Sequence, residues 1–124
     1  MKKQLITIAQ TKLHSGRSSI FKIDCDTLSD SEIETIAKLF LHLLPPFSSV
    51  EGVPTGGLRL ARALIPYCST HGWLLIVDDV LTTGCSMRNL RAGRPAVGAV
   101  IFSRGPCPGW ITPMFSLNGR LNSM

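Results

Sequence analysis

The sequence has few aromatic residues, no CxxC pair and no long apolar run. Aromatic residues make up 6% of the 124 residues, which argues against a platform of stacked nucleic-acid bases. One CxxH spacing, Cys68 to His71, is weak evidence for zinc. No apolar run approaches the roughly 20 residues that span a bilayer, and the basic N-terminus lacks the apolar stretch of a signal peptide. We therefore expect an unprocessed, soluble, cytoplasmic chain that does not enter a membrane.

The charge balance favours a small anionic ligand over nucleic acid. Lys and Arg together number 13 against 8 for Asp and Glu, a formal net charge of +5. An excess of this sign suits an anionic partner. The arginines are scattered along the sequence instead of forming a basic cluster, so nucleic acid is not the expected partner.

Strand and helix patterns alternate along the chain. A hydrophobic content of 44% in 124 residues is typical of one globular domain, which we place at 1–124. The patterns predict strands at 4–9, 19–23, 47–50, 73–77 and 96–102, and helices between Ser29 and Pro45, at 58–64 and at 86–91. Residues 105–124 are rich in Pro, Gly and Asn and are expected on the surface. This alternation predicts an α/β fold with a parallel sheet.

Two special turns directly follow predicted strands. The first, 51–57, is rich in glycine, and the second, 78–86, begins with two aspartates. Ligands of parallel sheets bind at the carboxyl ends of the strands. We therefore expect both turns at the same edge of the sheet, where they can share a site.

The residues from Leu74 to Ser86 combine a buried strand, two carboxylates and a turn that leads into a helix. Backbone N–H groups at such a turn can bind an anion, and Gly84 allows a close approach. The carboxylates of Asp78 and Asp79 suit sugar hydroxyls or Mg²⁺. The segment therefore predicts a site for a ribose 5-phosphate. The alternative is a strand that ends in two solvated aspartates and a helix cap.

This segment resembles the motif of type I phosphoribosyltransferases that binds phosphoribosyl pyrophosphate (PRPP). The resemblance covers roughly residues 47 to 115 and implies a small, Rossmann-like parallel sheet. It implies that Asp78 and Asp79 are the catalytic acidic pair, which holds the ribose hydroxyls and Mg²⁺, directly or through water. It assigns the 5-phosphate to the following turn: Thr82, Thr83, Gly84, Cys85 and Ser86. A second segment is similar to the family's pyrophosphate loop: Val53, Pro54, Thr55, Gly56 and Gly57.

The resemblance also implies a reaction and a place for the base. The family transfers ribose 5-phosphate from PRPP to a nucleobase and releases pyrophosphate, with Mg²⁺ as cofactor. The chain after the last predicted strand is similar to 6-oxopurine members, in which Arg104, Trp110 and Ile111 would contact the base, whereas Gly52-Val53-Pro54 resembles members that use orotate. The alternative is that Trp110 covers the core and Arg104 is a solvated strand end. On this reading the core is about 28–104, and a small hood comes from about 1–27 and 105–124.

The sequence departs from the family between the two motifs. Only fifteen residues separate Gly57 from Trp73, too few for the usual two strands and mobile catalytic loop. Three alternatives follow: a homodimer in which the neighbouring subunit supplies a lid, slow catalysis, or a non-catalytic regulator that binds PRPP or a nucleotide.

A second enzyme class is weighed against the first. Residues 23–28 match the DxDxT pattern of haloacid-dehalogenase-type phosphatases, with Asp24 as nucleophile and Asp26 as general acid. The lysine that this family needs before its second acidic pair is missing here. The alternative role of Asp24 and Asp26 is a polar loop and a helix cap.

Overall fold

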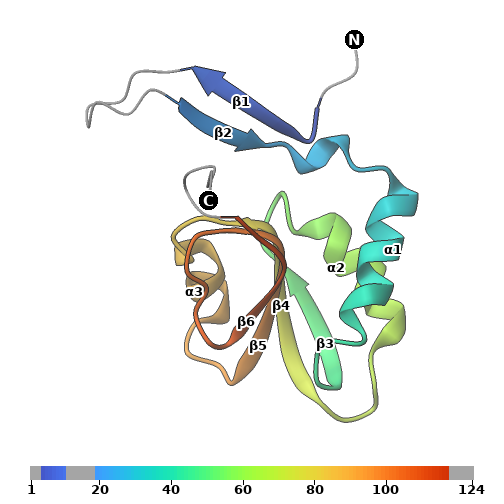
Figure 1. The fold of residues 1–124 in the computed structure, drawn as a ribbon. Coiled ribbons are helices and arrows are strands. Elements are labelled where there is room, and N and C mark those ends of the chain that lie inside the picture. Colours follow the sequence, from blue (N-terminus) through green and yellow to red (C-terminus); the bar gives the residue numbers. More distant parts are fainter. Residues whose placement is uncertain (1–3, 11–18, 118–124) are drawn as a thin grey trace.

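The computed structural model describes residues 4–10 and 19–117, which form two sheets and three α-helices. The main sheet contains four parallel strands in the order β3 (Phe47–Gly52), β4 (Trp73–Leu81), β5 (Ala96–Arg104) and β6 (Ile111–Leu117). Figure 1 shows these strands side by side. The predicted α/β class with a parallel sheet is confirmed.

Strand β6 corrects the prediction for the tail. Residues 105–124 were expected on the surface and in the hood, but Ile111–Leu117 pair with β5 along seven residues, from Gly98↔Ile111 to Arg104↔Leu117. Pro113 lies inside this strand because β6 is an edge strand, where one row of N–H groups has no neighbour. The proline inside the segment and the Pro- and Gly-rich chain before it concealed its strand character.

Strand β4 is longer than the sequence pattern predicts. It runs to Leu81, and its pairing with β5 continues through Val80↔Phe102 and Leu81↔Ser103. Asp78 and Asp79 therefore lie within the last part of a strand and not in a turn. A strand places successive side chains on opposite faces, so the two carboxylates can serve two different loops.

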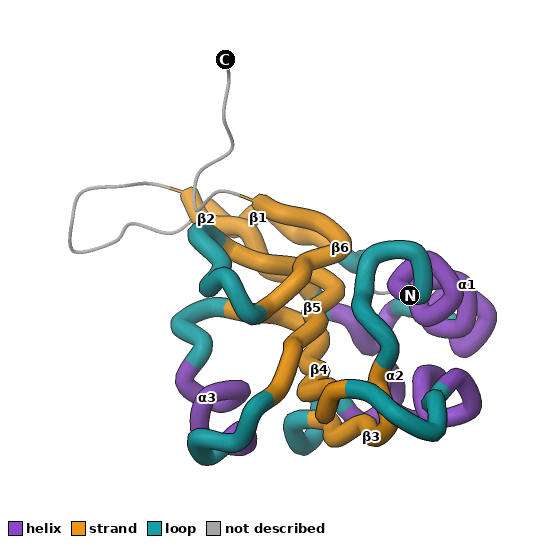
Figure 2. Tube along the Cα trace, turned by 90° about the horizontal axis from the view of Figure 1, so that it is seen from below, coloured by secondary structure: helices purple, strands orange, loops and turns teal. Residues whose placement is uncertain are grey.

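The helices cover both faces of the sheet. Helices α1 (Asp30–Phe40) and α2 (Leu58–Leu64) pack on one face, and α3 (Cys85–Arg91) lies on the other, as Figure 2 shows. A capping box starts α1: the Glu32 N–H donates to Ser29 Oγ (3.0 Å) and the Ser29 N–H donates to Glu32 Oε1 (2.8 Å). None of the helices among the described residues is long and apolar enough to cross a membrane.

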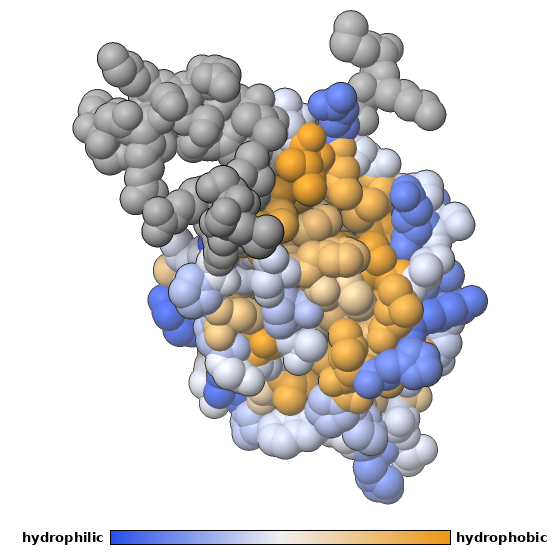
Figure 3. Space-filling view, in the orientation of Figure 1, coloured by the Kyte–Doolittle hydropathy of each residue, from blue (hydrophilic) through white to orange (hydrophobic). Residues whose placement is uncertain are grey.

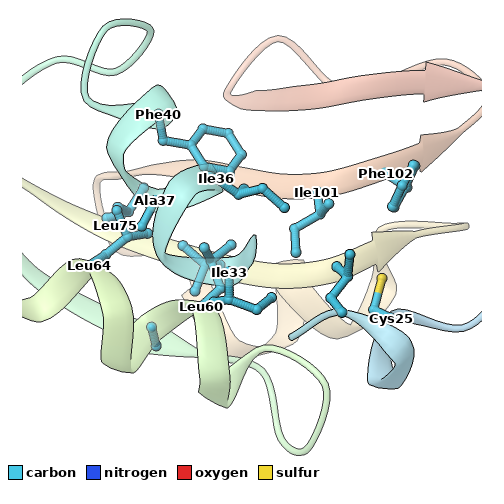
Figure 4. Packing of buried hydrophobic residues seen from close by; sticks show 14 of the residues in the cluster. Cys25, Ile33, Ile36, Ala37, Phe40, Leu60, Leu64, Leu75, Ile101 and Phe102 are labelled. Carbon is cyan, nitrogen blue, oxygen red and sulfur yellow. The ribbon is translucent and has the colours of Figure 1, made fainter. Parts of the chain in front are cut away.

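The main core lies between the sheet and the first two helices. Figure 4 shows Phe40, Leu60, Leu64 and Leu75 packed together, and none of the four is more than 1% exposed. A smaller cluster around Ile76, Met87 and Val100 packs α3 against the opposite face. The two clusters hold the sheet rigid, so the loops at its carboxyl edge start from defined positions.

The N-terminal segment forms a separate hairpin. Strands β1 (Ile6–Gln10) and β2 (Ser19–Ile23) pair antiparallel, and the predicted turn at 15–17 lies outside the described residues. The hairpin lies beyond the carboxyl ends of the parallel strands, at the top of Figure 1. A 3-10 turn, η1 (Cys25–Thr27), links it to α1.

The connection between β3 and β4 is short. Residues 58–72 contain α2, a second 3-10 turn, η2 (Ile65–Tyr67), and the chain that leads into β4. This agrees with the prediction of one helix and a turn in this interval.

Part of the sheet face beside α1 is apolar and open. A groove of about 370 Å³ lies between α1 and β6. Its walls include Leu28, Ile36, Leu39, Phe102 and Phe115. Leu39 and Phe115 are about half exposed, at 47% and 48%, and Figure 3 shows a continuous hydrophobic area on this side.

Candidate phosphoribosyl site

The glycine-rich loop after β3 lies directly against the end of β4. The Val53 N–H donates to the Val77 carbonyl (2.9 Å), and the Gly57 N–H donates back to the Val53 carbonyl (2.7 Å). A Cβ on Gly57 would lie 2.4 Å from the Val77 oxygen, so only glycine fits between loop and strand. Pro54, Thr55 and Gly56 at the tip of the loop are exposed, and the Pro54–Thr55 peptide bond is cis. The loop therefore presents its tip at the carboxyl edge of the sheet.

The side chain of Asp79, near the end of β4, contacts the glycine-rich loop that follows β3. Its carboxylate lies against Gly56: a Cβ on that glycine would come within 2.5–2.6 Å of Asp79 Oδ1, Cγ and Oδ2. The Val80 N–H donates to Asp79 Oδ1 (2.8 Å), which sets the direction of the side chain. The acidic pair and the glycine-rich loop are thus in direct contact.

Asp78 faces the other turn. It lines a pocket of about 30 Å³ together with residues 80–87. Its Oδ1 accepts the Asp79 N–H (2.8 Å). Burial, followed by a hydrogen bond with the Asp79 carboxyl group, raises the pKa of Asp78 from 3.8 to about 7. An anion beside this carboxyl group is therefore repelled less than it would be by a fully ionised pair.

The turn from Thr82 to Ser86 remains open to a ligand. Gly84 takes a left-handed conformation, with φ 83°, and precedes α3. Thr82, Thr83, Cys85 and Ser86 are exposed. Within the described structure, one N–H group of this turn has a protein acceptor: Cys85 donates to Thr83 Oγ1 at 3.3 Å. Four of the five residues of this turn are thus exposed at the carboxyl edge of the sheet, whereas Gly84 is buried.

Comparison with known proteins agrees with this geometry at the level of the fold. No protein-family model matches the chain, and no curated protein matches it in sequence. The chain is similar to the solved structure of orotate phosphoribosyltransferase from Mycobacterium tuberculosis H37Rv in complex with inorganic phosphate, with a TM-score of 0.64. Identity is 20%, and the match covers 88% of this chain and 86% of the other. The chain has the type I phosphoribosyltransferase fold.

The phosphoribosyltransferase fold does not bring the three predicted base-contacting residues together. Arg104 ends β5 at the carboxyl edge of the sheet, one residue beyond the Leu81↔Ser103 pair. Ile111 starts β6 at the other end of the sheet, where it pairs with Gly98 and is only 4% exposed. Trp110 packs near Gly98, and the Arg91 guanidinium lies 4.5 Å from its ring centroid.

The structure therefore places Trp110 and Ile111 at the amino end of the sheet, opposite the edge that carries Arg104 and the acidic pair. Because β5 and β6 are parallel, residues 105–110 must return the chain to the amino end of the sheet before β6 begins. Trp110 lies at the end of that return, where it covers the smaller core cluster. Its alternative role, as a cover for the core, is the one the structure supports.

The phosphatase alternative finds no support in the position of Asp24. This residue follows β2 of the hairpin and caps η1, where its Oδ1 accepts the Asp26 N–H at 3.2 Å. Thr27 Oγ1 donates to the Asp24 carbonyl at 2.9 Å. Asp24 and Asp26 thus stabilise a local turn, as the helix-cap alternative states.

Sequence reasoning missed Cys25 and Arg59. Cys25 is 7% exposed, and burial followed by the charge of Asp79 raises the pKa of its thiol to about 12. Figure 4 shows it beside the carboxyl end of β4. Nothing local in the sequence links residue 25 to residue 79, because their proximity depends on how the hairpin connection folds back over the sheet.

Proposed function

We propose that this protein binds PRPP with Mg²⁺ and transfers its ribose 5-phosphate to a nucleobase, releasing pyrophosphate. The observation that carries the proposal is the contact of Asp79 with Gly56 while Asp78 lines the pocket of residues 82–87. One pair of carboxylates thus lies between an exposed glycine-rich loop and an exposed hydroxyl-rich turn. A ribose with a phosphate at one end and a diphosphate at the other fits this order of groups.

The acidic pair is suited to Mg²⁺. Mg²⁺ is commonly held by one or two carboxylates, with water and substrate phosphates as its other ligands. In both Asp78 and Asp79, Oδ1 accepts the next backbone N–H. A carboxylate has further lone pairs with which it can bind a cation or a sugar hydroxyl. When bound, Mg²⁺ would neutralise charge on the leaving diphosphate.

The chain's own residues would position PRPP and supply polar groups near the charges that develop during transfer. Transfer from PRPP develops positive charge on the ribose and negative charge on the diphosphate. Carboxylates near the ribose and N–H donors near the phosphates act on those charges without moving. In the proposal, Val53–Gly57 face the diphosphate and Thr82–Ser86 face the 5-phosphate. Arg104, at the carboxyl end of β5, remains the residue proposed to contact a carbonyl oxygen of the base.

Calorimetric titration with PRPP tests the proposal. We expect saturable binding with one PRPP per chain that strengthens when Mg²⁺ is present, because Mg²⁺ held by Asp78 and Asp79 would neutralise charge on the diphosphate. Pyrophosphate release would then be measured with 6-oxopurines and with orotate. Ribose 5-phosphate serves as a control that lacks the diphosphate. Absence of PRPP binding with and without Mg²⁺ would contradict the proposal.

A non-catalytic role in binding PRPP or a nucleotide is the second candidate. The observation that favours it is the connection 58–72, which contains α2 and η2 and no extended loop. A closing loop normally excludes water from such a reaction. PRPP binding without pyrophosphate release for any base would favour this role.

We also propose that the protein acts as a cytoplasmic homodimer. The open apolar groove between α1 and β6 supports the formation of a dimer, since exposed apolar areas of this kind mark interaction surfaces. Leu39→Asp places a charge on the rim of the groove. We expect sedimentation to show a dimer for the wild type and a monomer for Leu39→Asp, with Leu43→Asp, a change at an exposed leucine outside the groove, as control. A wild-type monomer would refute this part of the proposal.

A further inference from the structure

The segment between the hairpin and α1 is held by a single arginine of α2. Arg59 Nη2 donates to the Leu28 carbonyl (2.7 Å) and to Asp30 Oδ1 (3.0 Å), and Nη1 donates to the Cys25 carbonyl (3.4 Å). The side chain is 34% exposed, so these bonds are partly shielded from water. A planar guanidinium can make all three at once, whereas a lysine ammonium has a single nitrogen.

The other end of Arg59 is joined to the glycine-rich loop. It is the second residue of α2, and that helix begins on the loop. The Gly57 N–H donates to the Val53 carbonyl, and the Ala61 N–H donates to the Gly57 carbonyl (3.0 Å). A movement of the loop is therefore transmitted to the position of Arg59 through backbone hydrogen bonds.

The segment that Arg59 holds reaches the acidic pair. Cys25, Leu28 and Phe102 belong to one buried cluster, and Cys25 lies beside the end of β4 in Figure 4. The charge of Asp79 acts on the Cys25 thiol more strongly than that of Asp24 or Asp26, its neighbours in the chain. Cys25, the first residue of segment 25–28, therefore lies on the Asp79 side of the sheet edge.

We propose that Arg59 is a positioning residue that holds segment 25–28 against α2, so that this segment closes one side of the PRPP site beside Asp79. The role rests on the proposed function, because it assigns a positioning residue to the same PRPP site. In a chain whose β3–β4 connection is short, this segment supplies a fixed boundary at the edge of the site. Losing it would expose Asp79 further to water and would lower the affinity for PRPP without removing any group that touches the ligand.

Two measurements on the full chain test this role. The first is the rate at which N-ethylmaleimide alkylates Cys25, followed by mass spectrometry of the peptide that contains it, with and without PRPP and Mg²⁺. The second is the dissociation constant for PRPP by calorimetry. The variants are Arg59→Lys, Arg59→Ala and Asp30→Asn, which keeps the two carbonyl acceptors. Arg62→Ala is the matched control, an exposed arginine of α2 for which the described structure shows no ion pair or hydrogen bond.

Loss of the Arg59 bonds is expected to expose the thiol and weaken binding together. In Arg59→Ala, Cys25 alkylation should rise about tenfold, because the buried thiol becomes accessible. The dissociation constant for PRPP should rise by a similar factor of about ten. Arg59→Lys should show a smaller change in both, and Asp30→Asn and Arg62→Ala should match the wild type. In the wild type, PRPP should slow Cys25 alkylation.

The outcomes separate the two claims. If Arg59→Ala and Arg59→Lys bind PRPP as tightly as the wild type, the positioning role is wrong, even when Cys25 becomes reactive. If Cys25 alkylation is unchanged in Arg59→Ala, the segment is held by other contacts and the role is also wrong. If the wild type does not bind PRPP, the proposed function fails, and this role fails with it whatever the alkylation rates.

Discussion

Asp78→Asn and Asp79→Asn are expected to abolish detectable PRPP binding while leaving the protein folded. Each variant keeps an Oδ1 that accepts the following backbone N–H, so the local geometry survives. Each loses the negative charge that holds Mg²⁺ or a ribose hydroxyl. Calorimetry with PRPP and Mg²⁺ measures the loss, and circular dichroism verifies the fold. Unchanged PRPP affinity in both variants would show that the acidic pair does not take part in binding PRPP.

The stability of the fold is expected to depend on pH through Asp78. The pKa of Asp78 is raised in the folded protein, from 3.8 to about 7, chiefly by burial. The folded state therefore binds a proton more tightly than the unfolded state, and this contribution to stability is fully present below about pH 4. It is lost as the pH rises through about 7.

Asp78→Asn should therefore change thermal stability in a pH-dependent way. At about pH 8 the wild type carries an unfavourable buried charge that the variant lacks, so the variant should melt at a higher temperature. The difference should shrink as the pH falls towards about 4. Thermal melts of both proteins at several pH values measure it. A variant that is less stable than the wild type at about pH 8 would show that the Asp78 carboxylate stabilises the folded state.

Gly56→Ala is expected to weaken PRPP binding strongly with little loss of stability. The added Cβ would lie 2.5–2.6 Å from the Asp79 carboxylate, so the carboxylate must move. Gly56 is exposed, and the group it displaces is the end of a side chain and not backbone. We expect a loss of roughly a hundredfold in affinity, the scale on which a displaced positioning group acts.

Two other glycine variants bracket that result. At Gly109 a Cβ would meet nothing within 4 Å, so Gly109→Ala should match the wild type in binding and melting temperature. At Gly57 a Cβ would meet the backbone of Val77 and Val53, so Gly57→Ala should destabilise the fold itself. Wild-type affinity in Gly56→Ala would mean that the Asp79 carboxylate can move away from the loop without cost.

Local sequence was sufficient to predict the residues of both turns. The run of apolar residues before Asp78, the hydroxyls after it and the glycines at 52–57 are consecutive, so their chemistry is visible without a structure. Parallel topology then predicted that both turns share an edge, and the contact of Asp79 with Gly56 agrees. The base site could not be predicted in the same way. Arg104 and Trp110 are close in sequence but separated by a return of the chain across the sheet.

Sequence alone determined the α/β class, the helix between Ser29 and Pro45, and the order of the two turns that follow β3 and the apolar part of β4, because each depends on residues within about one element of each other. Only the tertiary structure decided that 111–117 adds a fourth strand, that Trp110 covers the core, and that Arg59 holds the segment beside Asp79. These features join residues far apart in the chain or separated by a crossover. Their contacts arise from packing around the finished sheet, which leaves no periodic or local signal in the sequence.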